Sequence, residues 1–259
     1  MTIADVQSYS DHRNIAISRV GIKDYRHPVC FTDSESRPTN GVGRFNMYVN
    51  LPHDVKGTHM SRFIELLGTE TFSLSVASMP SFLDTMMTRL HATDGYVNIR
   101  LPFFIEKKAP VSGTPSLMDY EIELETDCHQ HQVSNTLIVH VPVTSLCPCS
   151  KQISEYGAHN QRSLISIAAT LTPNGRLTAT ELIQMVESQA SCALFSVLKR
   201  PDEKYVTERA YENAKFVEDV VRDLAQTLNQ HAAVQRYTVS SENFESIHNH
   251  SAFASITHL

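Results

Sequence analysis

Hydrophobic and polar side chains alternate along some stretches of this chain, whereas other stretches follow a helical period. Residues 43–51 and 118–126 alternate strictly, which is the period of two expected of a half-buried strand. Residues 81–91 instead place Leu83, Met86 and Leu90 on one side of a helix. The polar face of the second alternating stretch is acidic and is most simply a solvated sheet surface. Its members are Asp119, Glu121, Glu123 and Glu125.

The same two periods predict the remaining elements. Further strands are expected at residues 95–104, 137–143, 164–171, 236–240 and 252–257, and further helices at residues 56–67, 180–199 and 215–228. The helix over 180–199 is expected to end at Arg200-Pro201, because a residue before proline is disfavoured in the helical conformation. The order strand, strand, helix, helix, strand, strand thus occurs roughly twice. It predicts an α+β fold of antiparallel sheets with helices on one face.

Composition restricts the classes of function. A net charge of −6 argues against nucleic acid or a membrane surface as a general partner, because a phosphate backbone requires a basic face. Five cysteines without a disulfide framework indicate a reducing compartment. Residues 1–20 lack the charged start and apolar run of a secretory signal, and no window approaches a membrane span. We therefore expect a cytoplasmic protein with a flexible N-terminal arm over these residues.

Residues 144–163 combine side chains that an ordinary loop does not need. Cys147 and Cys149 flank Pro148, whose ring fixes its own φ and holds the two thiols on a stiff bend. His159 follows in a turn-prone run. Thiolate and imidazole are ligands that zinc and similar cations prefer, and a catalytic site needs only three protein ligands. Two alternatives stay open here: a redox pair of thiols, or two buried cysteines with a solvated histidine.

Three longer blocks favour the catalytic interpretation. They are VPVTSLCPCSKQISEYGAHNQRS at 141–163, KRPDEKYVTERAYENAKFVEDVVRD at 199–223 and SENFESIHNHSAFA at 241–254. With LPHDVKGTHMSRF at 51–63 and KKAPVSG at 107–113, they resemble the signature blocks of the type IB GTP cyclohydrolase family. The resemblance implies a metal-dependent hydrolase that opens the imidazole ring of GTP and releases formate. The product would be 7,8-dihydroneopterin triphosphate, in the first step of tetrahydrofolate biosynthesis and as a source for queuosine.

The resemblance also implies an architecture and partners. It favours two tandem tunnelling-fold (T-fold) modules, over residues 21–130 and 131–259, the second carrying most of the site. Barrels would form when chains assemble, and a homotetramer with active sites at its interfaces is expected. GTP would be the substrate and a divalent metal, Zn, Mn or Fe, the cofactor. The alternatives are a cyclohydrolase that yields a cyclic-phosphate dihydroneopterin and a non-catalytic module that acts as a metal or thiol switch.

The metal site is expected to draw on the cysteine bend and two further residues. Cys147, Cys149 and His159 are the first candidates, and Glu203 would add a carboxylate that broadens tolerance toward manganese or iron. Which thiol binds the metal and which takes part in proton transfer stays open, so both are also candidate catalytic residues. A disulfide between them would remove the thiolate ligands and inactivate the site.

Proton transfer and base recognition require further side chains. Ring opening needs a proton on the departing imidazole nitrogen, and His248 is the expected general acid, with Glu245 polarising the water or orienting the histidine. Alternation in an extended segment would put His248 and His250 on one face and Glu245 on the other. The resemblance favours Glu218 as the bidentate anchor of guanine, while Asp219 is expected to interact with the helix dipole.

The triphosphate requires several converging cationic groups. The candidates are Lys56, His59, Arg62, Lys107, Lys108, Lys151 and Arg162. Lys151 and Arg162 are the leading pair because they lie closest to the cysteine bend in the sequence.

Overall fold

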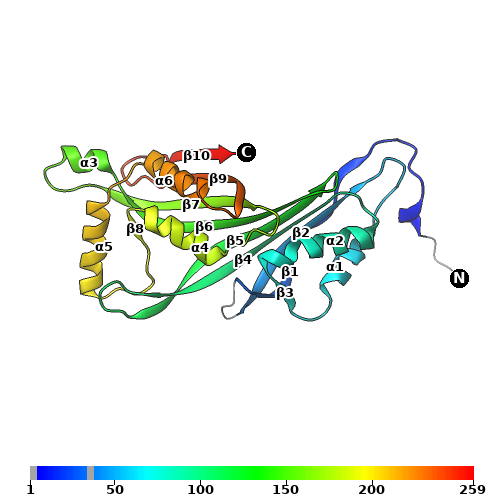
Figure 1. The fold of residues 1–259 in the computed structure, drawn as a ribbon, viewed down its shortest axis with the longest axis horizontal. Coiled ribbons are helices and arrows are strands. Elements are labelled where there is room, and N and C mark those ends of the chain that lie inside the picture. Colours follow the sequence, from blue (N-terminus) through cyan, green and yellow to red (C-terminus); the bar gives the residue numbers. More distant parts are fainter. Residues whose placement is uncertain (1–4, 34–37) are drawn as a thin grey trace. The chain divides into compact units, whose positions relative to one another are not determined.

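The computed structural model describes residues 5–33 and 38–259, and Figure 1 labels its elements. The strands are β1 (Ile17–Phe31), β2 (Thr39–Leu51), β3 (Phe72–Leu74), β4 (Gly95–Lys108), β5 (Pro115–His129), β6 (Gln132–Leu146), β7 (Asn160–Leu171), β8 (Cys192–Ala193), β9 (Val234–Asn243) and β10 (Ala252–His258). The helices are α1 (Met60–Leu67), α2 (Met79–Leu90), α3 (Pro148–Ile153), α4 (Ala179–Gln189), α5 (Arg200–Glu212) and α6 (Val217–Asn229), with 3-10 turns at Val6–Ser8 and Val76–Ser78. None of the helices within the described ranges has the length and apolar character needed to cross a membrane.

Two compact units make up the chain. The first extends to Leu101 and includes Glu123–Thr136, and the second contains Pro102–Ile122 and Leu137–Leu259. Strands β4, β5 and β6 therefore contribute residues to both units. The strand order is β6-β5-β4-β2-β1-β3 in the first unit and β10-β9-β7-β6-β5-β4 in the second, where β8 pairs with β6. The module boundaries expected near residues 20 and 130 stay predictions.

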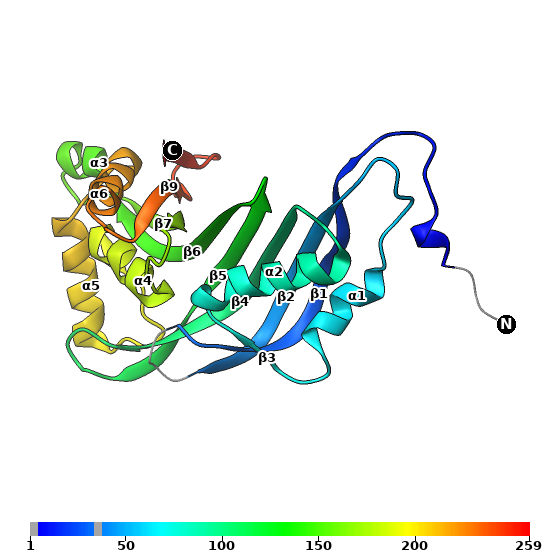
Figure 2. The same cartoon turned by 45° about the vertical axis from the view of Figure 1, so that its right-hand side comes forward.

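In the first unit, α1 and α2 cover one face of the sheet (Figure 2). Alternation along β2 buries Phe45, Met47 and Val49, while the residues between them are more exposed. Leu83 and Met86 of α2 are completely buried. The helical face predicted over residues 81–91 is therefore confirmed.

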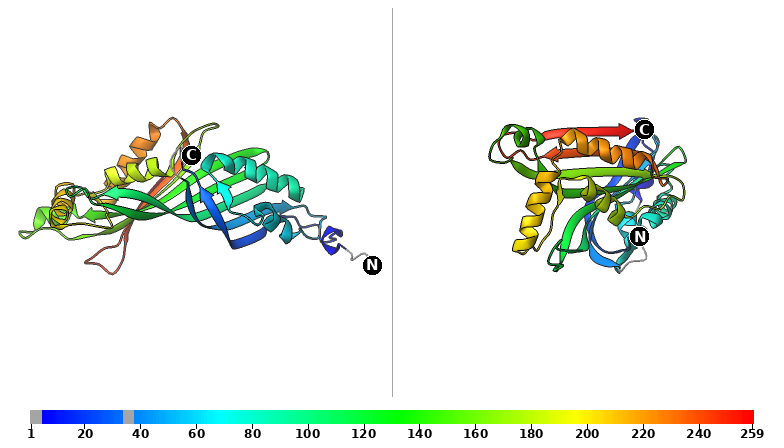
Figure 3. Two further views of the ribbon diagram at one scale, coloured as in Figure 1. Left: turned by 90° about the horizontal axis from the view of Figure 1, so that it is seen from below. Right: turned by 60° about the vertical axis from the view of Figure 1, so that its left-hand side comes forward.

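In the second unit, α4 and α6 lie on the same side of the strands (Figure 3). Helix α6 packs on β9 and β10 and buries Val220, Val221 and Leu224. Each such aliphatic side chain contributes about 1.5–3 kcal/mol when it leaves water. The antiparallel register of β7 and β9 places Ser163 opposite Asn243, at the strand ends that adjoin the site described below. The α+β class, with antiparallel pairing and helices on one face, is confirmed.

The helix predicted over residues 180–199 is wrong in its second half. Helix α4 ends at Gln189, the short β8 follows, and Arg200-Pro201 begins α5 instead of ending a helix. Proline is favoured in a first helical turn because the N–H that it lacks has no intrahelical partner there. Helix α5 was not predicted, since it buries little besides Asp202 and Ala210 and has no clear apolar face.

Two features of the sheets also differ from expectation. Strand β1 was not predicted, because register shifts between Ile17 and Val20 and between Ile22 and Tyr25 interrupt its alternation. Its first residues belong to the arm expected over 1–20. The acidic face of β5 is not simply solvated, because Glu123 and Glu125 are half-buried and accept hydrogen bonds from neighbouring β4 side chains. Burial and the hydrogen bond to Glu125 raise the pKa of Tyr96, one of these donors.

Candidate active site

A cavity of about 320 Å³ in the second unit gathers predicted site residues from separate parts of the chain. They lie at the start of α3, the start of β7, the start of α6 and in the segment between β9 and β10. These residues are Cys147, His159, Glu218, Glu245, His248 and His250. The cysteine bend and the C-terminal histidines therefore line one cavity, although about a hundred residues separate them in the sequence.

Cys147 caps the N-terminus of the short helix α3. Its Sγ atom accepts a hydrogen bond from the backbone N–H of Ser150, at 3.5 Å, and Pro148 occupies the first helical turn. Cys149 is exposed and does not line the cavity. The loop that returns to His159 passes through Gly157 with φ of 122°, a conformation that favours glycine. The bend thus separates the two thiols and places Cys147 at the cavity.

His159 belongs to a chain of side-chain hydrogen bonds. Its Nδ1 atom lies 3.0 Å from Oε1 of Gln161 and 3.3 Å from Oγ of Ser246. The Nε2 atom of Gln161 donates to Oε1 of Glu245 at 3.3 Å. His159 and Gln161 point the same way because they are two residues apart where β7 begins. Glu245 therefore reaches His159 through Gln161.

His248 and His250 lie in the segment that joins β9 to β10. Their rings stack with centroids 5.1 Å apart and an interplanar angle of 21°. The segment is not extended, and its bends bring Glu245 to the same cavity. Both histidines are exposed, so the cavity is open to solvent on this side.

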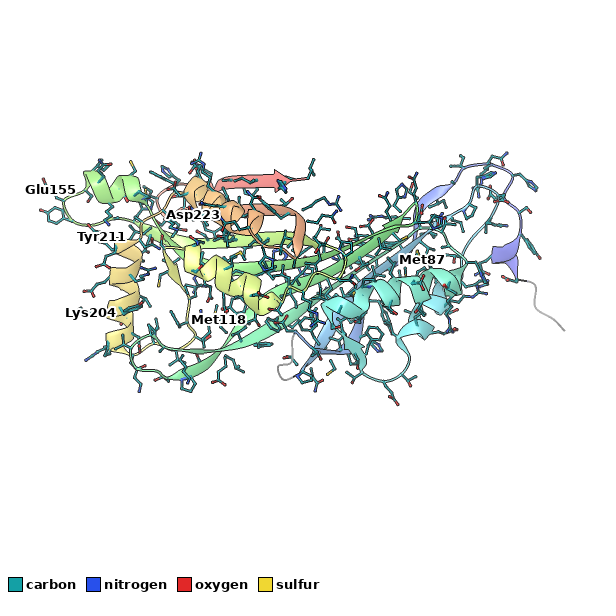
Figure 4. All side chains as sticks on the ribbon, in the orientation of Figure 1. Met87, Met118, Glu155, Lys204, Tyr211 and Asp223 are labelled. Atoms are coloured by element: carbon teal, nitrogen blue, oxygen red, sulfur yellow. The ribbon has the colours of Figure 1, made fainter. Side chains whose placement is uncertain are left out.

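Helix α6 contributes Glu218 in its first turn, where the helix dipole favours a negative charge. Asp219 accepts a hydrogen bond from the Phe216 backbone N–H at 3.0 Å and so caps the start of the helix. Lys215, just before the helix, also lines the cavity, and its Nζ lies 2.8 Å from Oδ2 of Asp223. Asp223 is labelled on α6 in Figure 4. The cavity wall at α6 therefore carries one exposed carboxylate and one paired ammonium group.

A cluster of buried polar side chains lies at the ends of the strands that adjoin the cavity. Oδ1 of Asn243 accepts hydrogen bonds from the hydroxyl groups of Ser163 at 2.7 Å and Ser145 at 3.4 Å, and these two serines also contact each other. All three residues are buried, and Asn243 lines the cavity. Such a satisfied network holds the ends of β6, β7 and β9 in one arrangement.

Several predicted residues do not line this cavity. Arg162 alternates with Gln161 along β7 and lines a different cavity of the same unit, together with Asn160. Lys151 directs its Nζ over the ring of Tyr211, 4.5 Å from the centroid. Glu203 is exposed on α5. The roles proposed for these residues and for Cys149 stay predictions.

Three triphosphate candidates lie in the first unit. Lys56 places its Nζ 5.9 Å from the ring centroid of Tyr9. The Nε2 atom of His59 lies 3.2 Å from a carboxylate oxygen of Asp5. Arg62 is half-buried in α1. Their role also stays a prediction.

The first unit contains a larger cavity, of about 650 Å³. It is lined by Tyr48, Tyr96 and the thiol of Cys128, and the Arg19 guanidinium lies over the Tyr96 ring at 4.0 Å. Burial raises the pKa of Cys128, so this thiol is a poor ligand or nucleophile at neutral pH. The chemistry of the donor groups, and not the size of the cavity, therefore favours the site in the second unit.

The donor set of the smaller cavity fits a divalent metal. Within residues 5–33 and 38–259, no group of three or more His, Cys, Asp or Glu side chains is close enough together to hold an ion as it stands. The chemistry is suitable all the same, because a thiol, imidazoles and carboxylates are the ligands that a borderline-soft cation takes. Cys147 and His159 are further linked by a backbone hydrogen bond of 3.2 Å from the N–H of Cys147 to the carbonyl of His159.

Sequence reasoning missed three polar residues of the cavity: Gln161, Lys215 and Asn243. The alternation of β7 pointed to Gln161, because a strand that directs His159 inward directs Gln161 the same way. Lys215 and Asn243 lie within the blocks that resemble the family, but neither residue type indicates chemistry by itself. Their places in the cavity depend on the tertiary fold.

Comparisons with known proteins identify the family of this chain. A family model described as type I GTP cyclohydrolase folE2 matches residues 3–254. The chain is 54% identical over 254 residues to GTP cyclohydrolase FolE2 2 of Dechloromonas aromatica (strain RCB), which covers 98% of this chain and 93% of the relative. It is 55% identical over 255 residues to GTP cyclohydrolase FolE2 of Azoarcus sp. (strain BH72), which covers 98% and 94%.

Solved structures show likeness of fold alone. A crystal structure of a highly active BTUO mutant matches with a TM-score of 0.50 and 8% sequence identity, over 93% of this chain and 99% of that chain. A Bacillus sp. TB-90 urate oxidase matches with a TM-score of 0.48 and 8% identity, over the same shares. From the family model and the relatives, this chain belongs to the type I GTP cyclohydrolase FolE2 family.

Proposed function

We propose that this chain hydrolyses GTP to 7,8-dihydroneopterin triphosphate and formate, the first step of tetrahydrofolate biosynthesis and a source for queuosine. Membership of the FolE2 family supports the reaction. The observation that carries it is the cavity in which Cys147, His159, Glu218 and His248 meet. Five free cysteines among the described residues agree with the reducing cytoplasm as the expected compartment.

Cys147 and His159 are the proposed ligands of a divalent metal, Zn, Mn or Fe. When bound, such a cation supplies a strong nucleophile from water at neutral pH, which attack on an aromatic imidazole carbon requires. Glu203 on α5 is the proposed carboxylate ligand, and Cys149 is proposed to take part in proton transfer. Neither lines the cavity of the isolated chain, so both proposals depend on the assembled enzyme.

The remaining predicted residues of the cavity are proposed to bind guanine and to transfer a proton. Glu218 is proposed to accept hydrogen bonds from the ring N–H and exocyclic amine of guanine, since its carboxylate offers two oxygens in a fixed spacing. His248 is proposed to deliver a proton to the departing imidazole nitrogen, and its exposure lets it exchange that proton with solvent. Glu245 is proposed to act on the water or on His159.

Triphosphate binding is proposed for cations outside the cavity. Lys151 and Arg162 are the proposed triphosphate ligands in the second unit, and Lys56, His59 and Arg62 are those proposed in the first unit. We also propose that residues 21–130 and 131–259 are two T-fold modules and that a homotetramer closes the barrels and completes the active sites at its interfaces. The strand order supports this assembly, because β10 and β3 are the edge strands of the ten-stranded sheet, and an edge strand can pair with a strand of a partner chain.

The test is turnover of GTP by the purified full chain. Incubation with GTP and Mn²⁺ should release formate and leave a product that becomes a fluorescent pterin on oxidation. Mass spectrometry of the product distinguishes the triphosphate from a cyclic phosphate. The proposal fails if neither formate nor a pterin forms with Zn²⁺, Mn²⁺ or Fe²⁺.

A further inference from the structure

Gln161 contacts two candidate site residues, one with each end of its side-chain amide. Its Oε1 lies 3.0 Å from Nδ1 of His159, and its Nε2 lies 3.3 Å from Oε1 of Glu245. Gln161 itself lines the cavity and is half-buried. His159 also contacts the segment after β9 directly, because its Nδ1 lies 3.3 Å from Oγ of Ser246.

The orientation of this amide follows from its neighbours. An ionised carboxylate only accepts hydrogen bonds, so the end of Gln161 that faces Glu245 must be the amino group. The carbonyl oxygen then faces His159, and a carbonyl oxygen also only accepts. Nδ1 of His159 must therefore carry the proton. The hydroxyl of Ser246, 3.3 Å from the same nitrogen, can accept a share of it.

A neutral imidazole carries one proton, so a protonated Nδ1 leaves the lone pair on Nε2. A histidine that binds a metal through one nitrogen commonly donates its other N–H to a carboxylate, carbonyl or water, which fixes the tautomer and the ring orientation. The amide of Gln161 occupies that place for His159. Glu245 accepts a hydrogen bond from the amino end of the amide. Its negative charge therefore favours the direction in which Gln161 donates to Glu245 and His159 donates to Gln161.

We propose that Gln161 is a positioning residue that holds His159 as the Nδ1–H tautomer, so that Nε2 is free to bind a divalent cation. This inference rests on the proposed function only in that it takes His159 as a metal ligand. It adds a residue that touches neither GTP nor the metal and acts through His159 and Glu245. Gln161 was not among the residues that the sequence motifs indicated.

The test begins with the tautomer of His159 in the metal-free full chain. Nitrogen-15 spectra of histidine-labelled protein at about pH 8.5, two units above the ordinary histidine pKa, report which ring nitrogen is protonated. The His159 signals are identified by their loss in His159→Gln. Wild type should show the Nδ1–H form. Gln161→Met removes both hydrogen-bonding ends at similar length and should shift His159 toward the Nε2–H form.

Affinity for Zn²⁺, measured by titration calorimetry with a competing chelator, gives the second readout. Gln161→Met should weaken Zn²⁺ binding by about 10–100-fold, the range typical for loss of such an outer partner. Gln161→Glu keeps an acceptor for His159 and loses the donor to Glu245, so it should retain the Nδ1–H form and near-normal affinity. Gln226→Met, on the exposed side of α6, is the matched control and should change neither quantity.

The results discriminate between the possible failures. Wild-type tautomer and Zn²⁺ affinity in Gln161→Met would overturn the inference, and so would loss of the Nδ1–H form in Gln161→Glu. If circular dichroism shows that Gln161→Met does not fold, the tautomer of His159 in Gln161→Glu alone tests the inference. None of these measurements uses GTP, so a protein that shows the tautomer and affinity changes but no turnover would refute the proposed function and leave this inference standing.

Discussion

The backbone N–H of Cys147 donates a hydrogen bond to the carbonyl oxygen of His159, with the two atoms 3.2 Å apart. This bond closes the loop between them and fixes a thiol and an imidazole on the same side of the cavity. The loop closure involves Cys147 and not Cys149, which lies one residue past Pro148 on the exposed side of α3. The two thiols of the bend are therefore not equivalent.

We predict that Cys147→Ser and Cys149→Ser have different effects on metal binding. Cys147→Ser removes a soft ligand from the cavity and should weaken Zn²⁺ binding by more than about 100-fold, beyond the range for outer-shell partners. Cys149→Ser should bind Zn²⁺ nearly as tightly as wild type in the isolated chain. Metal analysis and calorimetry under anaerobic conditions check both. Equal losses in the two variants would contradict this assignment of the thiols.

Glu218 should affect the binding of GTP and not of metal. Glu218→Gln replaces one acceptor with a donor, which cannot pair with the guanine N–H groups, and should raise KM by about 10–100-fold, equivalent to about 1.4–2.7 kcal/mol of binding free energy. Its metal content should stay normal, and a metal-depleted variant would show that Glu218 is a ligand instead. The matched control is Asp219→Ala in the same helical turn. It should leave KM unchanged and lower stability by about 0.5–1 kcal/mol, because Asp219 caps the helix.

The fold was predictable from the sequence wherever one side of an element is apolar. Strand β2 and helix α2 have such faces, and both were found where the pattern placed them. Helix α5 has no such face. Its first turn is instead fixed by Asp202, which accepts hydrogen bonds from the backbone N–H groups of Val111 and Ser112. These partners lie about ninety residues earlier in the chain. Contacts of this kind leave no periodic signal, so α5 could not be predicted from local pattern.

The site shows the same limit on a smaller scale. Nearness in sequence to the cysteine bend favoured Arg162, but alternation along β7 directs Arg162 to a different cavity and Gln161 to the cavity of His159. Residue type indicated the thiols, histidines and carboxylates, because these groups carry chemistry. It could not indicate Gln161, whose role depends on an acceptor at one end and a carboxylate at the other.

We predict that the stability of the folded protein depends on pH through Asp202. It is completely buried and accepts hydrogen bonds from the backbone of Val111, Ser112 and Lys199 and from the Ser112 hydroxyl. Burial alone would raise the pKa of Asp202, but these hydrogen bonds, led by the one from the Ser112 side chain, outweigh it and hold the pKa well below its usual range.

A carboxyl group whose pKa is lowered by folding stabilises the protein above its unfolded pKa, near 3.9, and loses that contribution as the pH falls toward the folded pKa. Wild type should therefore lose stability progressively below about pH 4. Asp202→Asn should unfold at a lower temperature at pH 7 and show a weaker acid dependence. Thermal unfolding followed by circular dichroism between pH 3 and pH 7 measures this, and parallel curves for the two proteins would refute the prediction.

Lys107 and Lys108 were both candidates for the triphosphate, and the structure distinguishes them. Nζ of Lys107 donates to Oε1 of Glu187 and to the Leu194 carbonyl, each at 2.7 Å, and the Tyr120 hydroxyl donates to the same Glu187 oxygen at 2.6 Å. The side chains of Lys107 and Glu187 are only 11% and 14% exposed. Lys107 therefore joins β4 to α4 and to the connection after β8, whereas Lys108 is exposed to solvent.

Removing one partner of a buried ion pair leaves the other charge without compensation. Lys107→Met should therefore lower the free energy of unfolding by about 3–5 kcal/mol. The folded fraction should bind GTP with an unchanged KM, because the ammonium group is already engaged within the protein. Lys108→Met is the matched control and should change stability by less than about 0.5 kcal/mol. Urea unfolding and steady-state kinetics of the three proteins provide the measurement. A raised KM with normal stability in Lys107→Met would contradict this prediction and place Lys107 at the triphosphate. A residue whose main partner is the substrate contributes little to the stability of the substrate-free protein.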